Sequence, residues 1–117
     1  MIETALSLTG IESVQNLFRK SKEEPGTYFI VFKNSTRCAT SRLALKAFES
    51  EWNLSVPVYL VQVIENRPAS EEVTRISGIR HESPQLLIIR NGTVIHHASH
   101  SAIEAGEAMR LIDSEPG

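Results

Sequence analysis

The sequence predicts an α/β protein in three layers, with helices on both faces of a small mixed sheet. Apolar, β-branched runs alternate with segments of helical periodicity, and two such strand–helix–strand units predict parallel strands joined by right-handed crossovers. An Asn91-Gly92 pair between two apolar runs predicts an antiparallel hairpin at the sheet edge. We therefore expect one domain over residues 1–117, with its core at about 10–112, built on a central four-stranded mixed sheet and an extra N-terminal helix.

The first half of the chain is predicted to form a helix, a strand and a second helix. Apolar side chains recur at helical spacing over residues 10–22. The uninterrupted apolar run at 27–32 is typical of a strand that is buried on both faces. After a short polar loop, helical periodicity begins at Cys38.

The second half is predicted to continue with a strand, a helix, a hairpin and a last helix. Pro68 suits the first turn of a helix, and Gly78 suits the position just past its end. Ser101 and Glu104 form a capping-box pattern, which predicts the start of the last helix. The expected strands are residues 56–63, 85–90 and 93–97.

Length, charge and cysteine content exclude several classes of protein. A chain of 117 residues can bury a core without disulfides or a metal, and a net charge of -2 gives no footprint for nucleic acid or a membrane surface. The sequence shows no signal peptide and no apolar stretch of the roughly 18–20 residues that a membrane span needs. One cysteine cannot form an internal disulfide, so we expect a cytoplasmic protein.

Cys38 lies where a polar loop meets the start of a predicted helix. A lone free cysteine is commonly a buried, inert side chain, and that is the alternative interpretation. The helix N-terminus, Arg37 and Lys33 would instead favour the thiolate, which is the form that attacks disulfides. Ser41, three residues further on, could point its hydroxyl at the sulfur as an uncharged donor. We therefore predict that Cys38 is a nucleophile tuned by Arg37 and Ser41.

The chain resembles a known family at these residues. A Cys-x-x-Ser after the first core strand, together with Pro84 at the start of the third, is similar to the thioredoxin fold, in which a cis-proline faces the reactive cysteine. A trans Pro84 that merely punctuates the strand is the alternative. The chain is more closely similar to the monothiol bacilliredoxins of the bacillithiol system. The most specific stretches are Phe32–Ser41 and Arg80–Gln85, with Ala98–His100 as a weaker third.

The resemblance implies a thiol–disulfide oxidoreductase that works with a single thiol. Cys38 would take a low-molecular-weight thiol from an S-thiolated cytosolic protein and pass it to a second small thiol. Bacillithiol or a similar thiol would be a co-substrate, and no bound cofactor or metal is implied. Because bacillithiol carries carboxylates, the start of the last predicted helix is a candidate anion site. The expected substrate-binding residues are Thr36, Ser83, Pro84 and Ser99.

Two other functions fit the same fold. The domain could be a non-catalytic adaptor that captures a peptide against the Pro84 loop, or a redox sensor in which an adduct on Cys38 is the signal. A metal site at the histidines is disfavoured, because His96 and His97 are adjacent on a predicted strand and would point to opposite faces. His81 would either modulate the thiolate or be a solvated loop residue.

Overall fold

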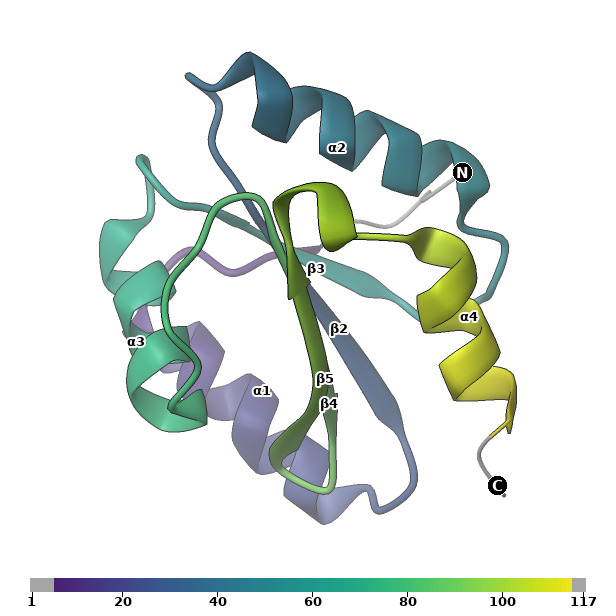
Figure 1. Ribbon diagram of the computed structural model, residues 1–117. Helices are drawn as coiled ribbons and strands as arrows, with labels where there is room; N and C mark the ends of the chain where they lie inside the picture. Colours follow the sequence, from purple (N-terminus) through teal and green to yellow (C-terminus); the bar gives the residue numbers. More distant parts are fainter. Residues whose placement is uncertain (1–5, 115–117) are drawn as a thin grey trace.

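The structure, a computed structural model, describes residues 6–114 of the chain. Within this part of the chain, a five-stranded sheet in the order β1-β3-β2-β4-β5 lies between two pairs of helices (Figure 1). The strands are β1 (Leu6–Ser7), β2 (Tyr28–Asn34), β3 (Val58–Gln62), β4 (Gln85–Arg90) and β5 (Thr93–Ser99). The helices are α1 (Ile11–Glu23), α2 (Ala39–Glu51), α3 (Arg67–Ser77) and α4 (Ala105–Ser114), with a 3-10 turn at His100–Ala102. None of the helices formed by residues 6–114 has the length and hydropathy needed to cross a membrane.

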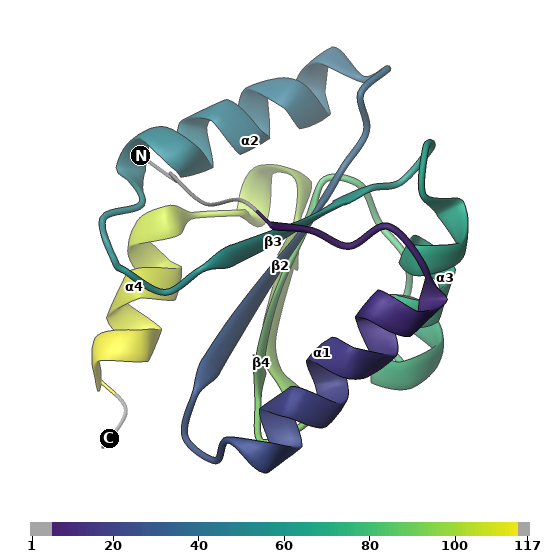
Figure 2. The ribbon, with the colours of Figure 1, turned by 180° about the vertical axis from the view of Figure 1, so that it is seen from behind.

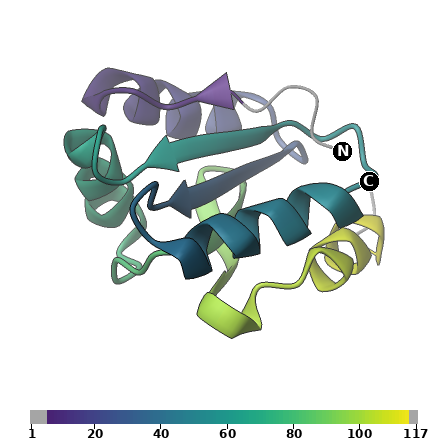
Figure 3. The ribbon, with the colours of Figure 1, turned by 90° about the horizontal axis from the view of Figure 1, so that it is seen from above.

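The central strand β2 divides its side chains between two cores. Phe29 and Val31 pack on the face covered by α1 and α3, whereas Ile30 and Phe32 pack on the face covered by α2 and α4. Figure 3 shows the sheet between these two helical layers. All four side chains are buried, so the predicted strand with two buried faces and the three-layer α/β/α architecture are confirmed.

Two predictions about the sheet are wrong. The described residues form a fifth strand, because Leu6–Ser7 pairs in parallel with Tyr59–Leu60 of β3 (Figure 2). Two residues are too few to show any periodicity in the sequence. In addition, β4 runs antiparallel to β2 rather than parallel. The reason is that residues 78–84 return along α3 to the end of the sheet where β3 stopped (Figure 1).

The hairpin between β4 and β5 is formed as predicted. Asn91 and Gly92 have φ angles of 54° and 79°, which is the pair of positive values that a tight two-residue hairpin turn requires. The turn is anchored to the rest of the fold, since the Gly92 N–H donates to Ser21 Oγ at 2.9 Å and the Gly26 N–H donates to Asn91 Oδ1 at 3.0 Å.

The last helix begins later than predicted. α4 starts at Ala105, and Ser101 lies in the 3-10 turn before it. His100 has a φ of 54°, so the chain changes direction after β5 before a helix can form. The Glu104 carbonyl accepts a hydrogen bond from the Ala108 N–H at 3.2 Å. The capping box predicted at Ser101 is therefore not the start of this helix.

Replacing Gly92 by alanine is expected to lower the free energy of unfolding by about 1–2 kcal/mol, because an L side chain is strained at positive φ. An added Cβ would also collide with the Lys22 side chain. Gly106→Ala in α4 is the matched control, since no positive φ is imposed there and alanine favours a helix. Urea unfolding measures both variants. Equal stability of the two would contradict the turn conformation.

Candidate active site

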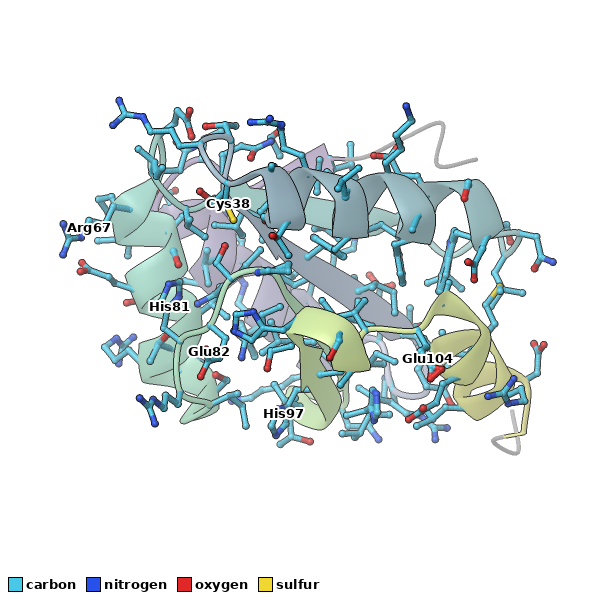
Figure 4. The ribbon with its side chains drawn as sticks, turned by 45° about the horizontal axis from the view of Figure 1, so that its top comes forward. Cys38, Arg67, His81, Glu82, His97 and Glu104 are labelled. Atoms are coloured by element: carbon cyan, nitrogen blue, oxygen red, sulfur yellow. The ribbon has the colours of Figure 1, made fainter. Side chains whose placement is uncertain are left out.

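The pairing of β2 with β4 brings the two predicted halves of the site to one end of the sheet. Lys33 of β2 pairs with Gln85 of β4, so the next position along places Asn34 across from Pro84. Cys38 follows four residues after Asn34, and Figure 4 shows it at the end of the molecule where β4 begins. The peptide bond between Ser83 and Pro84 is cis.

Cys38 occupies the N-cap position of α2. Its backbone is extended, with φ of −112° and ψ of 116°, and its carbonyl accepts a hydrogen bond from the Arg42 N–H at 3.0 Å. No side-chain hydrogen bond caps this helix. The side chain of Cys38 therefore starts where a capping side chain normally accepts hydrogen bonds from the first-turn N–H groups. These N–H groups stabilise negative charge. The thiol is partly exposed, so a substrate disulfide can approach it.

Ser41 has a different contact from the one expected. Its buried hydroxyl accepts a hydrogen bond from the Ser35 N–H at 2.9 Å and donates to Asn34 Oδ1 at 3.1 Å. The single hydroxyl proton is thus directed at Asn34 and not at the sulfur. This geometry arises because β2 continues to Asn34, two residues beyond the predicted strand. Ser41 acts in this structure as a positioning residue for the loop that carries Cys38.

Thr36 and Arg37 face the loop after β3. Thr36 Oγ1 donates to Glu65 Oε2 at 2.6 Å, and this hydrogen bond, with a smaller contribution from the exposed Arg37, holds the pKa of Glu65 below its usual value. The Thr36 carbonyl accepts a hydrogen bond from Arg42 Nη1 at 2.7 Å. The loop before Cys38 is therefore held from two sides, by α2 and by the β3–α3 connection.

The segment before β4 is tied to the turn after β5. The Pro84 carbonyl accepts a hydrogen bond from the His100 N–H at 3.1 Å. His100 Nε2 also lies 3.0 Å from Glu82 Oε1, and this contact holds the pKa of Glu82 below its usual value. Two hydrogen bonds from one residue thus fix the position of the proline segment.

Ser99 lies at this end of the sheet because of strand pairing, which the sequence did not indicate. It pairs with Gln85 across the β4–β5 hairpin. It ends β5 and precedes a three-residue 3-10 turn. The α-helix N-terminus predicted here as the basis of an anion site is therefore wrong. Nearby, the buried atoms Ser83 Oγ and Gln85 Oε1 have no hydrogen-bond partner among the described residues.

Lys33 is the site residue whose role the sequence analysis missed. It was expected in a polar loop, but it lies in β2 with its side chain fully buried. Its Nζ donates to the Ser70 carbonyl at 3.0 Å and to Thr74 Oγ1 at 3.2 Å, and lies 3.2 Å from His81 Nδ1. Burial lowers the pKa of Lys33 to about 8. Desolvation and the neighbouring Lys33 also lower the pKa of His81, an exposed loop residue whose Nδ1 contacts the buried ammonium.

Most of the chain also matches a known protein family. Residues 6–108 match the family described as Monothiol bacilliredoxin BrxC. The chain belongs to this family. The match covers most of the chain, and it confirms the resemblance carried by Phe32–Ser41 and Arg80–Gln85.

Solved structures confirm the thioredoxin-like fold of this bacilliredoxin. A protein described as a candidate oxidoreductase with a thioredoxin fold superposes with a TM-score of 0.74 at 23% identity, covering 94% of each chain. The thioredoxin pre-protein of Schistosoma mansoni gives 0.68 at 18% identity, covering 95% of this chain and 97% of the other. The thioredoxin of Fasciola hepatica gives 0.65 at 16% identity, with 92% and 96% covered.

The family and the fold agree with thiol–disulfide oxidoreductase chemistry, and Cys38 is the only cysteine in the chain of this bacilliredoxin. Cys38, Ser41, Pro84 and Ser99 all belong to the end of the sheet described above. No group of three or more metal-ligating side chains is found between residues 6 and 114.

Ser41→Ala is expected to lower the free energy of unfolding of the bacilliredoxin by about 1–3 kcal/mol, because the Ser35 N–H and Asn34 Oδ1 would lose their buried partner. Ser50→Ala is the matched control on the same helix, where the exposed hydroxyl bonds only the Ala47 carbonyl. That variant should change stability by about 0.5 kcal/mol or less. Denaturant unfolding distinguishes the two, and equal losses would contradict the positioning role of Ser41.

Lys33→Met is expected to stabilise the protein at pH 7. The folded-state pKa of about 8 lies below the ordinary 10.5, so the unfolded chain binds the proton more tightly. The wild-type free energy of unfolding should therefore rise through the window from pH 8 to pH 10.5, by about 3 kcal/mol at most from this group. The difference in free energy of unfolding between Lys33→Met and the wild type should therefore shrink over the same pH window, as measured by denaturant titrations. A difference that stays constant with pH would contradict the buried cation.

Proposed function

We propose that this protein removes bacillithiol, or a closely similar small thiol, from protein mixed disulfides by a monothiol mechanism. The observation that carries the proposal is a single, partly exposed cysteine at the N-cap of α2, at the sheet end where the cis-proline segment enters β4. Membership in the bacilliredoxin family supports the small thiol. The proposed setting is the cytoplasm, with S-thiolated proteins as substrates and no bound cofactor.

The first step transfers the small thiol to Cys38. The Cys38 thiolate attacks the sulfur of the small thiol in the mixed disulfide. A new disulfide forms between Cys38 and the small thiol while the original disulfide breaks, and the substrate cysteine leaves as a thiolate that takes a proton from water. The step needs no external oxidant or reductant, because one disulfide replaces another.

The second step regenerates the enzyme. With serine at position 41, no second thiol three residues away can displace the adduct. A second small-thiol molecule, as its thiolate, attacks the small-thiol sulfur of the adduct and releases the Cys38 thiolate. The products are the free enzyme and the symmetric disulfide of the small thiol. For each substrate cysteine that is reduced, one free small-thiol molecule is oxidised, and it ends in a disulfide with the small thiol that came from the substrate.

The proline segment would hold the substrate during transfer. Proline has no N–H, and the Pro84 carbonyl already accepts the His100 N–H, so the main chain of Ser83 is the proposed partner for an extended substrate strand. The Ser83 hydroxyl is buried without a hydrogen-bond partner among the described residues, and it would have to turn outward to join that contact. Thr36 would flank the same disulfide from the Cys38 loop.

Intact-mass spectrometry tests the function. Reduced protein incubated with a model protein carrying a bacillithiol mixed disulfide should gain one bacillithiol adduct while the model protein is reduced. Cys38→Ser should gain none, and added bacillithiol should remove the adduct from the wild type. Absence of an adduct, under conditions that modify a free cysteine peptide, would refute the proposal. An adduct that bacillithiol does not remove would favour a sensor instead.

A further inference from the structure

A hollow of about 450 Å³ opens beside α3, next to the candidate site. Its wall includes Val63, whose N–H donates to the Asn34 carbonyl at 2.9 Å, and His81, which lies three residues before Pro84. The hollow therefore borders both segments that form the site. Figure 4 shows Arg67, His81 and Cys38 at the same end of the molecule, on three different segments.

A buried positive charge lies behind this hollow. The Lys33 ammonium donates to Ser70 and Thr74, which both line the hollow, and it contacts the lining residue His81. These three acceptors are a carbonyl, a hydroxyl and an imidazole, so none of them neutralises the charge. Among the described residues, the three groups that this fully buried ammonium contacts are uncharged, so the cation favours an anion in the adjoining space.

Two further groups in the wall can donate to an anion. Because the ammonium donates to His81 Nδ1, the neutral imidazole carries its proton on Nε2, which is then a donor. Arg67 lies at the rim with its side chain 79% exposed. Its partner Glu71, which also lines the hollow, is 68% exposed, and such exposed ion pairs contribute little. The guanidinium can therefore exchange Glu71 for a carboxylate of a ligand.

We propose that this hollow binds the carboxylate-bearing end of the small thiol while its sulfur is joined to Cys38. Lys33 supplies the buried charge, and His81 and Arg67 supply the donors. The apolar side chains of Val63 and Ile64 contact the carbon skeleton of the ligand. This inference rests on the proposed function, and it assigns the recognition of the small thiol to the α3 side of the site rather than to Ser99.

Kinetics with two substrates test the proposal. The same model protein is supplied as a mixed disulfide with bacillithiol or with 2-mercaptoethanol, which has no carboxylate. Arg67→Gln should raise KM for the bacillithiol substrate about threefold to fivefold, and Lys33→Met about tenfold, with little change in kcat. The KM for the 2-mercaptoethanol substrate should change much less in both variants than the KM for the bacillithiol substrate. Arg19→Gln, an exposed change on α1, is the matched control and should leave both substrates unaffected.

Equal effects on the two substrates, or no effect on either, would overturn the anion site. Binding of free malate, followed by the amide NMR shifts of Ser70, Thr74 and His81, tests it without turnover. Malate should shift these amides in the wild type and in Arg19→Gln, and much less in Lys33→Met and Arg67→Gln. If the wild type accepts no bacillithiol substrate but malate shifts these amides, the proposed function fails and the anion site stands. Absence of shifts in an active wild type refutes the site alone.

Discussion

The backbone hydrogen bonds between β2 and β4 hold the candidate site together. They fix the register in which Lys33 lies across from Gln85, and this register sets which residue of the Cys38 loop approaches which residue of the proline segment. A slip of one residue would turn every side chain of β4 to the opposite face, and the apolar residues of two cores would be exchanged. The geometry of the site therefore depends on a pairing of two strands whose residues are almost all buried.

The last two residues of β2 are polar, and they belong to the candidate site. Asn34 points to the α2 side, where it bonds Ser41 and Gln62, and Lys33 points to the α3 side. Each buried polar group has partners on a different element, so the strand end is held from both faces of the sheet. Burying an ammonium without a carboxylate is unfavourable for stability, and such groups are concentrated where a protein binds or reacts.

Local patterns predicted most of the fold, and contacts distant in sequence decided what they missed. The run at 27–32, the Asn91-Gly92 turn and the helix start at Cys38 depend on neighbouring residues, and all are present. The predicted strand ends at Phe32, because a lysine follows. Lys33 nevertheless continues the alternation of Phe29 and Val31 on one face, and this was the available signal for a buried lysine. Its partners on α3 lie about forty residues away, where no local pattern could indicate them.

The solitary cysteine at the start of α2 also limits what oxidation can do to this protein. Each molecule can form only one disulfide, either with a small thiol or with one other protein molecule, and no thiol then remains. Oxidative cross-linking among copies therefore ends at a covalent pair and cannot grow into a polymer. Reduction of one disulfide restores the free thiol from either the adduct or the covalent pair.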